Sequence, residues 1–206
     1  MDTIPLLRQR FDAGEEVYYK TDHHWTSLGA YYAYTETMKT FGMEAETLPA
    51  ERFTRKTVAD SFYGTLWSAG GMKWVSPDRV EFWLAGNEDD FVVIADGKEQ
   101  EGLYSTRWLK EKDCYSAFLD GTHDVVTVKK KDGGERPTLL LLKDSFANSL
   151  APFLAQHFDL VLLNLSSSRA DYTDLSALSL EYGADAVMLV YTLENVITAD
   201  KLSRLR

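Results

Sequence analysis

The sequence has only one cysteine, Cys114, among its 206 residues. A single cysteine can form no internal disulfide and no cysteine-rich metal site, and the amphipathic segment around Cys114 favours a buried structural thiol. The sequence also lacks the roughly 18 or more uninterrupted apolar residues that a membrane-spanning helix needs. The longest candidate run, residues 138–142, is short enough to be a buried strand. We therefore expect no direct membrane insertion by this segment.

Basic residues are also scarce. The chain has 22 lysines and arginines against 32 aspartates and glutamates, so its formal net charge is -10 at pH 7. Such a surface repels the phosphate backbone of nucleic acids and anionic lipid headgroups. We therefore expect no nucleic-acid partner, whereas a neutral or acetylated carbohydrate would not be repelled.

Hydrophobic residues are plentiful. They make up 45% of the chain and include five tryptophans, so a substantial core can form. Length and composition predict a single domain over residues 1–206. Residues 1–14 are mixed in charge and contain no apolar stretch typical of a signal peptide.

Residues 17–41 predict a short strand followed by a helix. The strand is expected at residues 17–20, where β-favouring side chains gather. Thr26 is a good N-cap for the helix, and Gly42 follows its last turn as a stop signal. Helical spacing places five apolar side chains on one face: Leu28, Tyr31, Tyr32, Met38 and Phe41.

The middle of the chain, residues 59–131, is rich in β signals and is expected to form a β-rich insertion. The Asp96-Gly97 pair is typical of a hairpin turn. The elements expected in this zone are strands at residues 79–84, 91–95 and 124–130 and a helix at residues 113–119.

The last zone alternates strand and helix. The expected strands are residues 138–142, 160–165 and 186–191, and the expected helices are residues 146–158 and 174–182. This alternation predicts parallel pairing with right-handed crossovers. The fold class we expect is therefore α/β, with a mostly parallel sheet and a β-rich insertion.

Ser145 falls where the strand at residues 138–142 ends and a helix begins. Ligands in open α/β sheets bind at the carboxyl ends of strands. The N–H groups at a helix N-terminus favour the negative charge of a developing oxyanion. Ser145 is therefore a candidate nucleophile. The alternative is that Ser145 or Asp144 only caps the helix.

Asp22 and His24 are two residues apart, which places them on the same side of an extended segment. An aspartate that bonds one ring nitrogen fixes the histidine tautomer, and the other nitrogen can then accept the proton of a serine. His24 is the better candidate for the base, and Asp22 for the residue that orients it.

A competing hypothesis makes Asp22, His23 and His24 ligands of a metal ion. In an extended segment His23 would point away from His24, and no HExxH-type spacing supports such a site. We therefore expect no metal and no cofactor.

Three further features are candidates for the same pocket. Asn148, one helical turn after Ser145, could donate its amide to an oxyanion or cap the helix near Pro152. Trp25 could form the floor of the pocket or pack in the core. The polar residues 166–169 follow the second strand of the last zone, where they could line the pocket or form a solvent loop.

The order of motifs resembles that of the bacterial DHHW protein family. Residues 19–26 (YKTDHHWT) and 29–32 (GAYY) resemble its signature. Residues 61–68 (SFYGTLWS) resemble a second segment of the family. Residues 143–149 (KDSFANS) and 152–154 (PFL) resemble a third. The resemblance covers roughly residues 17–191, which is most of the chain, and the motifs occur in the family's order.

The DHHW family is in turn similar to the alginate O-acetyltransferases, whose domain is SGNH-hydrolase-like. Carried over residue by residue, Asp22, His24 and Ser145 occupy the triad positions. Tyr63, which lies in the second motif, is a further candidate for oxyanion or substrate binding. The resemblance implies a cell-envelope or extracellular enzyme that moves acyl groups on a polysaccharide acceptor. It also implies a membrane-bound O-acyltransferase as the acyl source.

The chain departs from the family pattern in two places. Residues 166–169 replace an acidic segment that contains arginine and tyrosine, so substrate contacts there are not carried over. The anchor and additional sequence that usually precede the first motif do not occur before it here, so we expect either that part of the sheet is missing or that the sequence is a trimmed piece. The sequence does not assign the oxyanion glycines, and Gly64 and Gly121 are no more than candidates.

A different class of function is a non-catalytic carbohydrate-binding or scaffold module. Trp67, Trp74 and Trp83 could supply its sugar-stacking surfaces, although core packing is the default for each. The complete set of Asp22, His24 and Ser145 argues against this alternative, because a module without catalysis has no physical need for all three.

Overall fold

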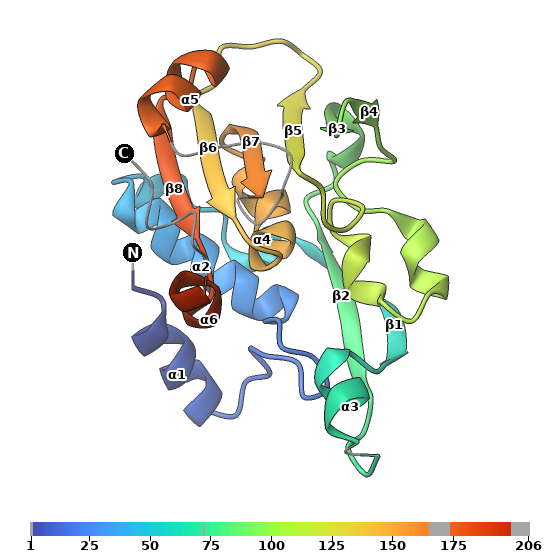
Figure 1. Ribbon diagram of the computed structural model, residues 1–206. Coiled ribbons are helices and arrows are strands. Elements are labelled where there is room, and N and C mark those ends of the chain that lie inside the picture. Colours follow the sequence, from blue (N-terminus) through green and yellow to red (C-terminus); the bar gives the residue numbers. More distant parts are fainter. Residues whose placement is uncertain (1, 72, 165–173, 199–206) are drawn as a thin grey trace. The chain divides into compact units, whose positions relative to one another are not determined.

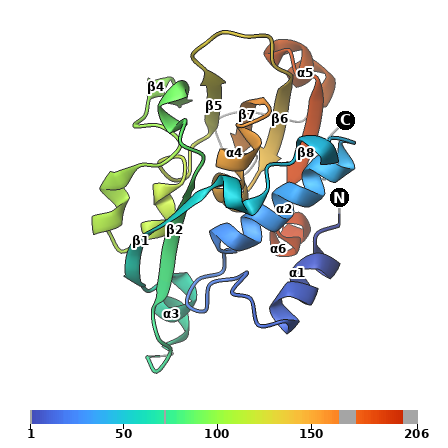
Figure 2. The same ribbon diagram turned by 180° about the vertical axis from the view of Figure 1, so that it is seen from behind.

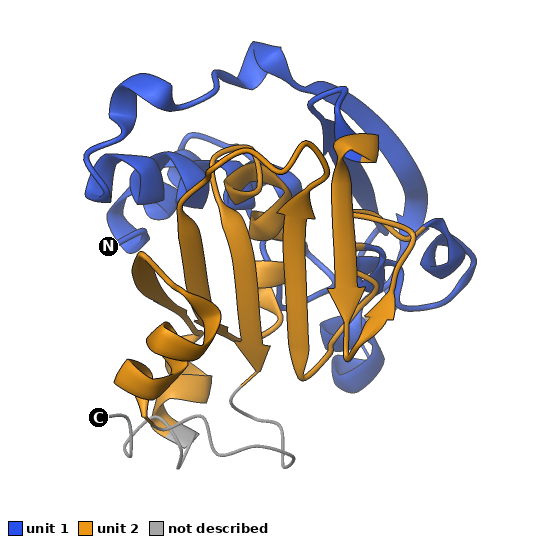
Figure 3. Cartoon of the chain, turned by 90° about the horizontal axis from the view of Figure 1, so that it is seen from above, with its two compact units in different colours: residues 1–88, 106–117 blue, residues 89–105, 118–206 orange. Residues whose placement is uncertain are grey.

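The computed structural model describes residues 2–71, 73–164 and 174–198. Its internal contacts divide the chain into two compact units (Figure 3). The first comprises residues 1–88 and 106–117, and it contains Asp22 and His24. The second comprises residues 89–105 and 118–206, and it contains Ser145.

The first unit combines helices with a two-stranded antiparallel sheet. Its elements are α1 (Ile4–Asp12), α2 (Ser27–Thr40), β1 (Thr54–Phe62), α3 (Thr65–Gly70) and β2 (Asp78–Leu84). Of these, α2 and β2 were expected from the sequence. The 3-10 turns of this unit include Cys114–Ala117, where the sequence predicted a longer helix. Cys114 is buried there, as expected.

Helix α2 begins and ends where the sequence predicts. Thr26 Oγ1 accepts a hydrogen bond from the backbone N–H of Gly29 at 3.2 Å, which is the expected N-cap. Gly42, just beyond the helix, has a positive φ of 72°, which glycine adopts without strain. Tyr31 and Met38 of the predicted apolar face are buried, and Tyr34 beside them is fully buried.

The strand predicted at residues 17–20 is wrong. Tyr18 forms only an isolated antiparallel bridge with Trp25, so the chain doubles back on itself within a few residues. Two backbone bonds close this loop, from Tyr19 N to His24 O at 3.2 Å and from Thr26 N to Val17 O at 3.0 Å. The β-favouring side chains therefore stabilise a closed loop and not a strand of a sheet.

The second unit is built on a six-stranded sheet. Its strands are β3 (Phe91–Ala95), β4 (Lys98–Glu99), β5 (Val125–Lys130), β6 (Thr138–Lys143), β7 (Asp159–Asn164) and β8 (Ala186–Val190). The strand order is β4-β3-β5-β7-β6-β8. Figure 1 shows β6 between β7 and β8, and both of these pairings are parallel, as predicted.

The prediction of a mostly parallel sheet is wrong, because the sheet is mixed. The β3–β4, β3–β5 and β5–β7 pairings are all antiparallel. Strands from the zone expected as an insertion thus extend the edge of the parallel part. Asp96 and Gly97 join β3 to β4 with φ values of 48° and 78°, which is the hairpin turn that the sequence predicted.

Helices α4 (Phe146–Leu154) and α5 (Leu175–Tyr182) connect the parallel strands. The first connection runs from β6 to β7, and the second returns past β6 to β8. Two right-handed crossovers that run in opposite directions place their helices on opposite faces of the sheet. Figure 2 shows α4 across one face, whereas α5 packs on the other. The chain continues from β8 into α6 (Leu193–Thr198).

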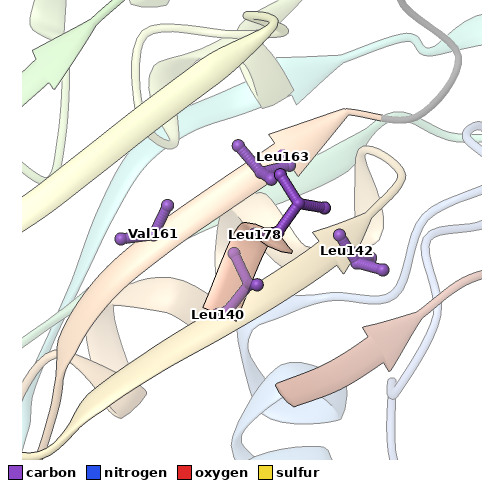
Figure 4. Close-up of a cluster of buried hydrophobic side chains, with 5 residues drawn as sticks. All are labelled: Leu140, Leu142, Val161, Leu163 and Leu178. Atoms are coloured by element: carbon purple, nitrogen blue, oxygen red, sulfur yellow. The ribbon is translucent and has the colours of Figure 1, made fainter. Parts of the chain in front are cut away.

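A leucine-rich cluster joins α5 to the sheet. Leu178 of α5 packs against two neighbouring strands, and the side chains that it meets are Leu140, Leu142, Val161 and Leu163 (Figure 4). Leu139 and Leu141 of β6 point to the opposite face and are also fully buried. Strand β6 is therefore buried on both faces, which explains its continuous apolar sequence.

The two crossovers also define where a ligand can bind. Because α4 and α5 leave the sheet toward opposite faces, the carboxyl ends of β6 and β7 form a topological switch point. Ser145 follows β6 at this point.

Among the described residues, no helix is both long and apolar enough to span a membrane.

Candidate active site

The loop that carries Asp22 is fastened by a buried carboxylate. Asp78, at the start of β2, accepts hydrogen bonds from the backbone N–H groups of Lys20 at 3.0 Å and Thr21 at 2.8 Å, and from Thr21 Oγ1 at 2.5 Å. Thr21 Oγ1 in turn accepts a hydrogen bond from Gly64 N at 3.1 Å. This network fixes the backbone on which Asp22 and His24 stand.

The structure brings Asp22 and His24 together. Asp22 Oδ1 lies 2.5 Å from His24 Nδ1 and accepts a hydrogen bond from the backbone N–H of His24 at 3.0 Å. Asp22 Oδ2 accepts hydrogen bonds from Thr65 N at 2.9 Å and from Thr65 Oγ1 at 3.0 Å. Both oxygens are satisfied although Asp22 is only 3% exposed, so the carboxylate is held in one orientation.

The electrostatics of the pair favour an ionised aspartate. Burial alone would raise the pKa of Asp22, but the hydrogen bonds from His24 and Thr65 outweigh it and keep that pKa well below its usual range. An ionised carboxylate can only accept, so the proton of neutral His24 resides on Nδ1. The tautomer then presents Nε2 as the basic nitrogen, as a general base requires.

An aromatic side chain fixes the plane of the imidazole. Tyr115, from the turn Cys114–Ala117, stacks on His24 with ring centroids 3.6 Å apart and an interplanar angle of 9°. The ring of His24 is thus held by Asp22 at one edge and by Tyr115 on one face. Tyr115 was not found from the sequence, because it lies far along the chain in a segment expected to be helical.

Gly64 allows the backbone to approach Asp22. A Cβ at this position would lie 2.3 Å from both Cβ and Oδ2 of Asp22, which no real contact allows. The backbone N–H of Gly64 donates to Thr21 Oγ1. The role of Gly64 that the structure supports is therefore close packing beneath Asp22.

His23 does not point away from His24. The centroids of the two rings lie 3.9 Å apart, and the ring planes are tilted by 36°. The rings come together because the segment bends where an extended strand was expected. Asp22, His23 and His24 each offer a ligand atom, and these atoms lie within 4.8 Å of one another. His23 Nδ1 lies 2.6 Å from Thr65 Oγ1, so a metal bound through the two Nδ1 atoms would displace both of these hydrogen bonds.

A groove of about 490 Å³ opens beside Asp22 in the first unit. Its lining comes from the end of β1, the turn into α3, α3 itself and residues 112 and 113. It includes Phe62, Tyr63, Thr65, Ser68 and Lys112. The Tyr63 ring also packs against Trp67, with centroids 4.7 Å apart. A contact between Tyr63 and substrate stays a prediction. Trp25 is buried at 6% exposure, as core packing requires.

Ser145 occupies the N-cap position of α4, and its side chain makes no capping hydrogen bond. Asp144 takes that role, because its Oδ1 accepts a hydrogen bond from Phe146 N at 3.0 Å. Its Oδ2 accepts hydrogen bonds from Thr192 N at 2.7 Å and Asn195 Nδ2 at 2.9 Å. The capping alternative therefore applies to Asp144 and not to Ser145.

Asn148 is buried one turn after Ser145. Its Nδ2 donates to the carbonyl of Gly121 at 3.0 Å, and its Oδ1 accepts from Lys143 Nζ at 2.7 Å. The backbone N–H of Gly121 donates to the carbonyl of Phe118 at 3.2 Å. An oxyanion role for Asn148 stays a prediction, and its observed role is to join three segments of the second unit.

The three predicted triad residues are divided between the two units. Asp22 and His24 are joined within the first, and Ser145 stands at the switch point of the second. Their combination into one triad stays a prediction. Residues 166–169, the other predicted lining segment, lie outside the described residues.

Comparison with known proteins adds a family and a fold. Residues 5–164 match the family model described as DHHW protein. No curated protein matches the chain.

Several solved structures match the chain, among them the three that follow. A DHHW family protein from Eubacterium siraeum has a TM-score of 0.73 at 20% identity, over 99% of this chain and 68% of that one. Bacillus cereus PatB1 with a sulfonyl adduct has a TM-score of 0.72 at 19% identity, over 98% and 70%. The O-acetyltransferase domain of Pseudomonas putida AlgJ has a TM-score of 0.47 at 13% identity, over 100% and 63%, which does not establish a shared fold.

Proposed function

Because the chain belongs to the DHHW family, we propose that it is a serine-dependent O-acyltransferase or esterase. It acts on O-acetyl groups of a cell-surface polysaccharide with Asp22, His24 and Ser145 as its triad. An SGNH-hydrolase-like fold is part of this proposal.

The single observation that carries the proposal is the hydrogen bond between Asp22 and His24. Structural histidines have no need of a buried, ionised carboxylate at 2.5 Å, backed by two bonds from Thr65 and by a stacked tyrosine ring. A general base has that need, because its tautomer must be fixed and its protonated form must be stabilised.

The proposed reaction proceeds through an acyl-enzyme. His24 Nε2 accepts the proton of Ser145 Oγ as Oγ attacks the acyl carbonyl carbon of the donor. The tetrahedral intermediate collapses, the donor oxygen leaves, and it takes the proton from His24. A hydroxyl of the acceptor then loses its proton to His24 and attacks the acyl carbon. Ser145 Oγ leaves and recovers the proton. Water in place of the acceptor gives hydrolysis.

The second unit supports the nucleophile role of Ser145. Helix α4 starts directly after Ser145, so the positive end of its dipole favours negative charge at this point. The side chain of Ser145 is not used for capping, because Asp144 has that role. Both features are expected of a serine whose Oγ becomes a nucleophile at the carboxyl end of a strand.

The groove beside Asp22 supports a carbohydrate acceptor. Tyr63 provides an aromatic face, and Thr65 and Ser68 provide hydroxyls, which together suit a sugar ring. The net charge of -10 favours a neutral acceptor over a strongly anionic one. We also propose a cell-envelope or extracellular location and a membrane-bound O-acyltransferase as the acyl donor, both on the basis of family membership.

The test combines substitution with covalent labelling. PatB1 has been crystallised with a sulfonyl adduct. We therefore expect an arylsulfonyl fluoride to inactivate this protein and to label Ser145, as mapped by peptide mass spectrometry. Ser145→Ala should abolish both labelling and hydrolysis of an activated acetyl ester. Ser61→Ala, at an exposed serine of β1, is the matched control and should leave both unchanged.

Two outcomes would contradict the proposal. Full esterase activity in Ser145→Ala would exclude Ser145 as the nucleophile. Activity that a chelator abolishes and zinc restores would favour the metal alternative at Asp22, His23 and His24.

A further inference from the structure

Lys143 is a fully buried lysine at the end of β6. Its strand neighbours are Asn164 of β7 and Val190 of β8, so it lies in the interior of the sheet and not at an edge. Lysine is almost never fully buried unless its charge is paired, because the ammonium loses its hydration. The position therefore calls for an explanation.

No salt bridge compensates this burial within the part of the chain that the structure describes. The hydrogen bond that Lys143 Nζ makes there goes to a neutral acceptor, Asn148 Oδ1, at 2.7 Å. The carboxylate of Asp144 is directed instead at Phe146 N, Thr192 N and Asn195 Nδ2. Burial lowers the pKa of Lys143 to about 8, although the charges of Asp144 and Asp96 act in the opposite direction.

The hydrogen bond from Lys143 helps to hold Asn148 in one orientation. An ammonium can only donate, so Asn148 must present its Oδ1 to Lys143. Its Nδ2 then faces the carbonyl of Gly121 and donates to it at 3.0 Å. Without the ammonium, the buried Oδ1 of Asn148 would lose this donor, and the amide would be held less firmly against the Gly121 carbonyl.

Gly121 ends a loop whose backbone is strained. Leu119, Asp120 and Gly121 have φ values of 52°, 61° and 96°, and a non-glycine residue rarely adopts such values. Strained conformations persist only where the surroundings determine them, and they gather at functional sites. Asn148 is one of the groups that fix this loop, since its side chain binds the Gly121 carbonyl.

The same residues surround the turn that carries Ser145. Lys143 precedes Ser145 by two residues, and the backbone N–H of Asn148 donates to the Ser145 carbonyl at 3.1 Å. The buried ammonium, the oriented amide and the strained loop thus converge on the corner between β6 and α4. All of these contacts lie within the second unit.

We propose that Lys143 is a positioning residue for the reaction at Ser145, which orients Asn148 and so fixes the 119–121 loop against the start of α4. This inference rests on the proposed function. An apolar side chain of similar length would fill the same space without the cost of a buried charge. The lysine is therefore retained for what its ammonium does at this corner.

The test compares Lys143→Met with wild type in hydrolysis of an activated acetyl ester. We expect kcat to fall on the order of ten-fold to a hundred-fold, with KM nearly unchanged and no loss of thermal stability. Wild-type kcat should fall as pH rises through about 8, where Lys143 loses its charge, and Lys143→Met should lack this alkaline limb. The other titratable groups that the structure describes near the loop include Asp96, Asp120, His123 and Asp144.

Lys129→Met, at an exposed lysine of β5, is the matched control and should keep wild-type kcat and pH profile. Lys143→Gln is the second variant, because its amide can still donate to Asn148 without a charge. Lys143→Gln should retain more activity than Lys143→Met and should also lack the alkaline limb. If Lys143→Met does not fold, Lys143→Gln alone tests the inference. Wild-type kcat and an unchanged alkaline limb in either soluble variant would overturn the inference. If Ser145→Ala is inactive in the same assay, the proposed function is still supported even where the inference about Lys143 has failed.

Discussion

His24 Nδ1 lies 2.5 Å from Asp22 Oδ1, and Thr65 holds the other oxygen of the same carboxylate. Thr65 is 43 residues from Asp22 in the sequence, so the orientation of this pair depends on the fold of the whole first unit. The arrangement fixes the tautomer of His24, and with it the nitrogen that can act as a base.

Asp22→Asn should remove most of the activity while keeping the fold. An asparagine can donate to Nδ1, which would move the ring proton to Nε2 and leave no base. We expect kcat for acetyl ester hydrolysis to fall on the order of 10³-fold. The control is Asp60→Asn, at an exposed aspartate of β1, which should have wild-type kcat. Substantial activity in Asp22→Asn would mean that His24 does not act through this tautomer.

Gly64→Ala should lower both stability and activity. The new Cβ would lie 2.3 Å from Asp22, so the carboxylate or the backbone must move. We expect a loss of about 1–3 kcal/mol in the free energy of unfolding, measured by urea titration, together with a lower kcat. Gly134→Ala is the control, because its Cβ would have only one neighbour, at 3.8 Å. Equal stability of the two variants would contradict the close packing at Gly64.

Asp22 should also contribute to the pH dependence of stability. Its folded pKa is lower than that of an unfolded aspartate, which is about 3.9, so the folded state binds fewer protons. The stabilisation is therefore complete above that value and is lost as pH falls below it. Urea titrations between pH 7 and pH 3 should show a smaller loss of stability for Asp22→Asn than for wild type. Parallel curves would show that Asp22 is not held as an ionised acceptor.

Lys143 should change the pH dependence of stability in the opposite direction to Asp22. Its pKa of about 8 is below that of an unfolded lysine, about 10.4, so the buried charge destabilises the fold at pH 7. This destabilisation is relieved as pH rises from about 8 toward the unfolded value. Lys143→Met should therefore be at least as stable as wild type at pH 7, and its advantage should shrink toward pH 10. An advantage that grows with pH would contradict burial of a charged lysine.

The periodic parts of the fold could be predicted from the sequence. Helix α2 has a capping threonine, a glycine stop and an apolar face, and the hairpin at Asp96 and Gly97 has its turn signal. Strands β6, β7 and β8 are apolar runs separated by helical segments, which fixes their parallel pairing. Local patterns determine these elements, so they can be recognised without tertiary information.

The mixed sheet and the contacts around the site could not be predicted in this way. The antiparallel pairing of β5 with β7 depends on which sheet edge is available after folding, and β5 has no local signal for it. Thr65 and Tyr115 reach Asp22 and His24 from distant segments. Lys143 follows four buried leucines, and only the structure shows that its ammonium is buried with them.

The measurement that tests the central claim most directly is mass spectrometry of the protein quenched with acid during turnover of an activated acetyl ester. The account predicts a mass increase of one acetyl group, located on Ser145 by peptide mapping and absent from Ser145→Ala. It also predicts faster decay of this acetyl group when a polysaccharide acceptor is added. Turnover without a covalent intermediate, or an acetyl group that forms in turnover on another residue, would contradict the Asp22, His24 and Ser145 mechanism.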